Sequence, residues 1–69
     1  MKKRSKGPFD GFDRIELVSK QEGVYIYIFR KHDSAFPEED YLVDDFLLAM
    51  EICEEDYRVP LDRWEDVRG

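Results

Sequence analysis

The chain has 69 residues, with 11 basic and 17 acidic side chains and a net charge of −6 at pH 7. Hydrophobic residues make up 42% of it, which is too much apolar material for a disordered chain. This length excludes a multidomain enzyme, and a single cysteine, Cys53, excludes an internal disulfide. A lone thiol fits a reducing compartment, and no apolar run approaches the ~20 residues of a membrane span. The sequence therefore predicts a cytoplasmic protein of one domain.

The first ten residues are strongly basic. Met1 to Lys6 carries a charge of +4 and is followed by Gly7, Pro8 and Gly11, which interrupt regular structure. This pattern predicts a flexible basic arm over residues 1–10 and a single folded domain over residues 11–69.

Two strands joined by a turn are predicted next. Over residues 12–19, Ile15 and Leu17 alternate with polar side chains, which is the period of a half-buried strand. Residues 19–23 have the composition of a hairpin turn. The predicted strand over residues 24–30 is β-branched or aromatic up to Arg30 and is apolar on both faces. We therefore place this second strand in the middle of the sheet.

A loop over residues 31–40 precedes a short third strand at residues 41–43. Asp44 or Asp45 then serves as the N-cap of a helix that ends near Tyr57. At helical spacing, the predicted buried face and the predicted exposed face separate cleanly, apart from Leu47, which falls among acids. The buried face holds Phe46, Ala49, Met50, Ile52, Cys53 and Tyr57, and the exposed face holds Leu47, Glu51, Glu54 and Glu55. An alternative is a longer helix that starts at Pro37 and leaves only two strands.

Together these elements predict an α+β fold. The core of the prediction is a three-stranded antiparallel meander packed by one helix, in the order β-β-β-α. Pro60 ends the helix, and residues 60–67 form a short C-terminal turn or helix. Leu61 and Trp64 are expected to fold back onto the core.

Catalytic and metal-binding patterns are missing from the sequence. His32 is the single histidine. Its neighbours Asp33 and Ser34 do not predict a triad with it, because adjacent residues rarely point at one another. Loops that start at Asp33 or Asp40 do not match the calcium-binding pattern, and no glycine-rich phosphate loop is present. We therefore expect a protein that is not an enzyme and has no cofactor and no metal.

The aromatic residues of the second strand admit three interpretations. Tyr25, Tyr27 and Phe29 can pack beneath Trp64, can stack on the bases of a single-stranded nucleic acid, or can form a protein interface. Residues 7–69 carry a charge of −10, which repels phosphate and makes nucleic acid the weaker option.

Acidic residues dominate the second half of the chain. Residues 38–69 carry a charge of −9, and such charge steers association with basic proteins. The sequence predicts a small acidic protein-binding module of bacterial or phage type, acting as an inhibitor, immunity protein or adaptor. The alternatives are a structural homodimer and a nucleic-acid accessory protein that uses the basic arm and the aromatic strand. The candidate partner-binding residues are Asp44, Asp45, Glu51, Glu54, Glu55, Tyr25, Tyr27, Phe29 and Trp64.

Overall fold

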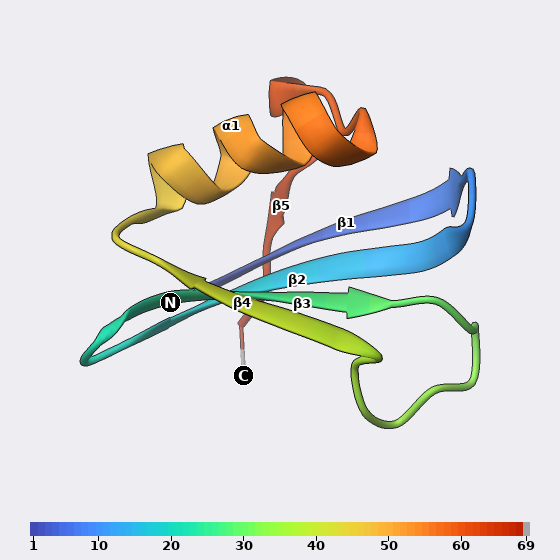
Figure 1. The fold of residues 1–69 in the computed structure, drawn as a ribbon, viewed down its shortest axis with the longest axis horizontal. Helices are drawn as coiled ribbons and strands as arrows, with labels where there is room; N and C mark the ends of the chain where they lie inside the picture. The colour runs from blue at the N-terminus through green and yellow to red at the C-terminus, as the bar shows by residue number, and fades with distance from the viewer. Residues whose placement is uncertain (69) are drawn as a thin grey trace.

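The computed structural model describes residues 1–68, with Pro8 described by its backbone alone, so the domain predicted over residues 11–69 extends one residue beyond the described part. One antiparallel sheet carries one helix on a single face (Figure 1), which confirms the α+β class. The strands lie in the order β4-β3-β2-β1-β5. The elements are β1 (Lys2–Phe9), β2 (Phe12–Lys20), β3 (Gly23–Phe29), β4 (Glu39–Val43), α1 (Phe46–Tyr57), the 3-10 helix η1 (Leu61–Arg63) and β5 (Glu65–Asp66).

The predicted three-stranded meander is present as β2, β3 and β4, and β3 lies in the interior of the sheet, as expected. β2 and β3 pair in a register that places Leu17 opposite Ile26. The turn between them depends on Gly23, whose φ is +147° and where an added Cβ would lie 2.5 Å from the carbonyl oxygen of Val43. A side chain would therefore disturb both the turn and the approach of β4 to β3.

Strand β1 replaces the predicted flexible arm, and this is a correction. Residues 2–9 pair with β2 over most of their length, with one irregularity between Lys6 and Phe9. Their basic side chains lie beside acids of the neighbouring strands: Lys2 contacts Glu16 at 3.2 Å, and Lys3 contacts Asp66 at 2.7 Å. The charges that suggested a solvated arm therefore form cross-strand pairs, which favour strand pairing.

Strand β5 is a second addition to the predicted fold. Glu65 and Asp66 pair with Arg4 and Lys3 at the outer side of β1. Part of the predicted C-terminal segment is thus a 3-10 turn, as expected, and part of it extends the sheet.

Helix α1 begins after Asp45, whose carboxylate accepts a hydrogen bond of 2.8 Å from the backbone N–H of Leu48. The alternative helix from Pro37 is wrong, because residues 39–43 are paired in β4 instead. Ala49 and Cys53 are buried against the sheet, whereas Leu47 is 64% exposed, as its position on the polar face predicted.

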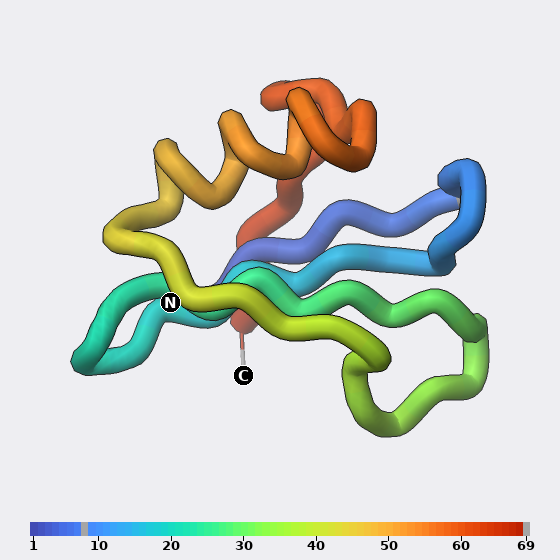
Figure 2. Tube along the Cα trace, in the orientation of Figure 1, coloured from blue at the N-terminus to red at the C-terminus, as the bar shows by residue number. Residues whose placement is uncertain are grey.

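The core lies between α1 and the sheet (Figure 2). Alternation along β2 and β3 sends one set of side chains toward the helix and the other set to the opposite face. The buried members of the core are Phe12, Ile15, Leu17, Val24, Ile26, Ile28, Ala49, Cys53 and Val59. The helix does not reach the other face of the sheet, which is open. We call this the open sheet face.

Candidate protein interface

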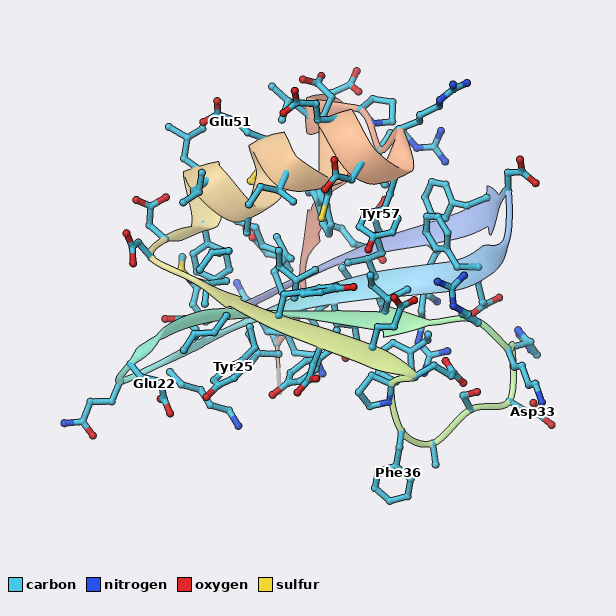
Figure 3. All side chains as sticks on the ribbon, viewed as in Figure 1. Glu22, Tyr25, Asp33, Phe36, Glu51 and Tyr57 are labelled. Carbon is cyan, nitrogen blue, oxygen red and sulfur yellow. The ribbon has the colours of Figure 1, made fainter. Side chains whose placement is uncertain are left out.

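The candidate partner-binding residues lie on two separate surfaces. Tyr25 lies on the open sheet face, while Glu51 projects from the far side of α1 (Figure 3). The whole sheet and the helix separate these two side chains. The structure therefore does not bring the aromatic and acidic candidates together into one site.

The two tyrosines of β3 stack on each other. Their ring centroids are 5.7 Å apart and the rings are nearly parallel. The hydroxyl of Tyr25 donates a hydrogen bond of 3.0 Å to the carboxylate of Glu22. This bond raises the pKa of Tyr25, while a backbone hydrogen bond and then the Tyr25 hydroxyl lower the pKa of Glu22. The pair is thus fixed within the chain, since its ring face and one hydroxyl already have partners.

Neither Phe29 nor Trp64 is available as an exposed anchor. Phe29 is buried beneath the guanidinium of Arg14, which lies 3.9 Å from the ring centroid. Trp64 packs against the core on the helix side of the sheet, so it does not cover the rings of β3. Its indole N–H is buried without a hydrogen-bond acceptor among the described residues.

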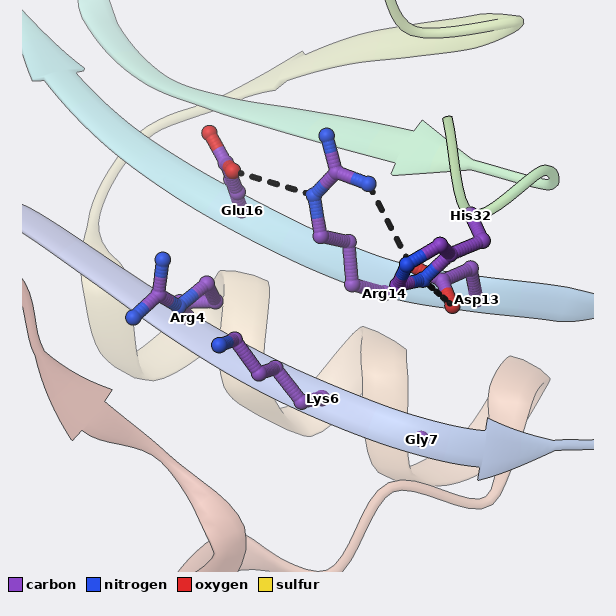
Figure 4. Close-up of a pocket in the computed structure, with 7 residues that line it drawn as sticks. All are labelled: Arg4, Lys6, Gly7, Asp13, Arg14, Glu16 and His32. Carbon is purple, nitrogen blue, oxygen red and sulfur yellow. Dashed lines mark hydrogen bonds and ion pairs between the residues drawn. The ribbon is translucent and has the colours of Figure 1, made fainter. Parts of the chain in front are cut away.

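The arginines on the open sheet face contact neighbouring carboxylates. Arg14 contacts Asp13 at 3.2 Å and Glu16 at 3.4 Å, and Arg4 contacts Glu65 at 3.2 Å. Both arginines line a pocket of about 480 Å³ (Figure 4), whose lining residues are Arg4, Lys6, Gly7, Asp13, Arg14, Glu16 and His32. A phosphate entering it would compete with the carboxylates that already contact Arg4 and Arg14, although Lys6 forms no ion pair among the described residues.

His32 has no catalytic surroundings. Its side chain is 97% exposed, and its Nδ1 lies 3.6 Å from the carboxylate of Asp13. Ser34 donates its hydroxyl to Glu38 at 2.6 Å and not to the imidazole. The histidine, aspartate and serine that are adjacent in sequence are thus not assembled in space.

Cys53 is likewise inert. It is fully buried, and burial, more than the nearby charge of Asp56, raises the pKa of its thiol to about 12. A nucleophilic cysteine requires a thiolate with access to solvent, and neither condition holds. Within residues 1–68, no cluster of three metal-ligating side chains occurs, and no helix is long and apolar enough to cross a membrane.

The outward face of α1 combines acidic and apolar side chains. Glu51, Glu54 and Glu55 are exposed, and no basic side chain among the described residues lies within ion-pair distance of them. Leu47 and Leu48 precede them and are 64% and 40% exposed. Asp44 is exposed at the start of the helix, whereas Asp45 serves as its N-cap. We call Leu47, Leu48, Glu51, Glu54 and Glu55 the helix outer face.

A groove between β4 and α1 was not predicted. It has a volume of about 330 Å³ and is lined by Ile26, Tyr41, Leu42, Val43, Ile52, Asp56 and Tyr57. Burial and then a hydrogen bond with Tyr41 raise the pKa of the Tyr57 phenol, so it stays protonated. The sequence carried one signal for this groove, the apolar Tyr41-Leu42-Val43 segment between acids, but that segment also fits an interior strand.

No family model matches this chain, and neither a characterised protein nor a solved structure shows significant similarity to it.

Proposed function

We propose that this chain is a small, non-enzymatic protein-binding module of the inhibitor, immunity or adaptor type. It binds a basic protein surface through the helix outer face, with Asp44 extending the negative surface at the start of α1. The observation that carries this proposal is the position of acidic residues at the C-terminal end of α1, where a negative charge destabilises a helix.

The acids of α1 oppose the helix dipole. Glu54 and Glu55 lie in the last turn, where the partial charge of the backbone is negative, and that turn has no basic residue. A negative side chain there costs about 0.3–1 kcal/mol, whereas a positive one stabilises the helix. Their contribution to folding is therefore unfavourable, and binding of a cationic partner offers a physical reason for their presence.

The two exposed leucines give the same face an apolar component. Leu47 and Leu48 lie next to the acids and leave 64% and 40% of their surfaces exposed. Interfaces combine an apolar centre with a polar rim, and charge complementarity accelerates association. In the proposed complex, the leucines contact the partner directly and the acids attract its basic residues.

Nucleic acid is a less favourable partner. The open sheet face has tyrosines and cations, but Lys2, Arg4 and Arg14 each contact a carboxylate. Binding to phosphate gains free energy from neutralising charge, and at these three residues a carboxylate already neutralises it.

The test is capture of partners from a lysate of the source cells with tagged protein, at about 50 mM and about 500 mM salt. We expect a basic protein that is retained at low salt and lost at high salt. Glu51→Lys/Glu55→Lys should abolish its capture. Asp10→Lys/Asp33→Lys makes the same change in net charge at exposed sites off the helix and should retain it. Equal loss with both variants, or capture that salt does not affect, would contradict the proposal.

A further inference from the structure

The outer edge of β4 is open. β4 is the last strand of the sheet on its side and pairs, among the described residues, with β3. Tyr41 and Leu42 in its middle are 46% and 49% exposed. An edge strand presents backbone N–H and C=O groups that can pair with another extended chain.

An apolar groove runs along this edge. Ile52 and Tyr57 of α1 face Val43 and Tyr41 of β4 across it, and Ile26 of β3 also lines it. In strand addition, backbone hydrogen bonds supply affinity and pockets for alternate side chains supply specificity. The edge of β4 and the groove beside it provide both features.

The charge around the edge is negative. Asp40 lies within β4, Asp44 and Asp45 follow it, and Asp56 lines the groove from the helix. No basic side chain of residues 1–68 forms an ion pair with any of these four carboxylates. Glu39 differs, since it contacts Arg30.

We propose that an extended segment of a basic partner pairs with β4 as a sixth strand of the sheet. Its apolar side chains enter the groove between β4 and α1, and its lysines or arginines, which point to the opposite face, contact Asp40 and Asp44. This proposal rests on the proposed function, because it assigns how the same basic partner continues from the helix outer face onto the sheet.

A second copy of this chain does not fit the edge. Antiparallel pairing of two β4 strands about Tyr41 places Glu38 of each copy opposite Asp44 of the other. A shift of the centre to Leu42 places Asp40 opposite Asp44 and Glu39 opposite Asp45. Like charges directly opposite each other are destabilising, so these registers disfavour a homodimer and favour a cationic strand.

The test is an NMR titration of the isotope-labelled protein with the synthetic peptide Lys-Val-Lys-Val-Lys-Val-Lys, which supplies alternating charge and apolar side chains. We expect the backbone amides of residues 39–43 to shift and their hydrogen exchange to slow by about tenfold or more. The matched peptide with glutamate in place of lysine should produce neither change. Shifts confined to the helix outer face would overturn strand addition while leaving the proposed function in place. Absence of any shift at about 1 mM peptide would also overturn strand addition. The capture of partners from a lysate then tests the proposed function separately.

Charge reversal at the edge gives the second arm of the test. Asp40→Lys/Asp44→Lys should weaken peptide binding by about tenfold or more, because it removes the complementary charge. Asp33→Lys/Asp62→Lys changes the net charge equally at exposed residues that do not line the groove and should change binding by less than about threefold. Equal weakening by the two variants would show that net charge alone attracts the peptide and would overturn the assigned site.

Discussion

The central guanidinium carbon of Arg14 lies over the ring of Phe29, 3.9 Å from the ring centroid. This contact buries an aromatic side chain on the open sheet face. Arg14 also contacts Asp13 and Glu16 and donates a hydrogen bond of 3.1 Å to the carbonyl of Ser34. One cation thus covers the ring, neutralises two carboxylates and fixes the loop that follows β3. Phe29, a candidate interface residue from its sequence, has a structural role.

Arg14→Ala should lower the free energy of unfolding by about 1–2 kcal/mol. The substitution exposes Phe29 and removes a largely buried cation–π contact, along with a charged hydrogen bond to Ser34. Urea denaturation followed by tyrosine and tryptophan fluorescence measures the loss. Lys31→Ala, at an exposed position of the same loop, is the matched control and should stay within about 0.5 kcal/mol of the parent. Equal stability of the two variants would show that the contact of Arg14 with the Phe29 ring does not stabilise the fold.

Ile26→Ala should cost about 2–5 kcal/mol, because Ile26 is buried at the centre of β3 and its truncation leaves a cavity. In a domain of this size that loss is comparable to the whole stability. Leu47→Ala is the control: it removes a similar side chain from an exposed position and should change stability by less than about 0.5 kcal/mol. A native-like melting curve for Ile26→Ala would contradict the assigned core.

The elements that the sequence predicted correctly are those with a clear apolar period. The spacing of apolar side chains predicts burial in three elements. These are β2, through Ile15 and Leu17, β3, which is apolar on both faces, and the capped helix after Asp45. β1 does not show such spacing, because Ser5 is the one buried side chain among those the structure describes in this strand, and the others are largely basic. What holds β1 is pairing with acids distant in sequence, and no local pattern reveals such partners.

The candidate site was predictable only in part. The helical period correctly assigned Glu51, Glu54 and Glu55 to an exposed face and identified Leu47 as the exception on it. Which residues share one surface depends on how the sheet and the helix pack, and spacing along the chain does not contain that information. For the same reason the groove between β4 and α1 was not anticipated.

Gly23→Ala should be more destabilising than Gly11→Ala. Both glycines have positive φ, +147° and +89°, so both substitutions strain the backbone. A Cβ at Gly11 meets open space, with Arg30 as its nearest neighbour at 3.9 Å, and the cost should be about 1–2 kcal/mol. At Gly23 the carbonyl oxygen of Val43 is too close, so β4 must move away from β3, and about 3 kcal/mol or more is expected. Thermal unfolding of the two variants compares them directly, and equal losses would contradict the assigned turn.

Glu54→Lys/Glu55→Lys should raise the melting temperature while it weakens partner binding. Each reversal removes an unfavourable charge from the last turn of α1 and adds a favourable one. Each of these two changes should stabilise the helix by about 0.3–1 kcal/mol. Asp33→Lys/Asp62→Lys, with the same change in net charge at exposed residues outside α1, controls for the general relief of repulsion in an acidic protein. If the two double variants gain equal stability, the dipole does not oppose these acids, and the main argument for their role in binding fails.

Cys53 should react with a thiol reagent only through unfolding. Burial raises the pKa of its thiol from 9.0 to about 12, so the folded protein keeps the proton at a pH where the unfolded chain releases it. Since the unfolded state binds fewer protons in this range, stability contributed by Cys53 falls as the pH rises from about 9 toward about 12. At pH 8 the rate of modification should follow the population of the unfolded chain, with the unfolding rate as its upper limit, and should increase with urea. Cys53→Ala, which removes the titrating thiol, should show a shallower loss of stability above pH 9. Modification of the native protein as fast as a free thiol would contradict the buried position of Cys53 between α1 and the sheet.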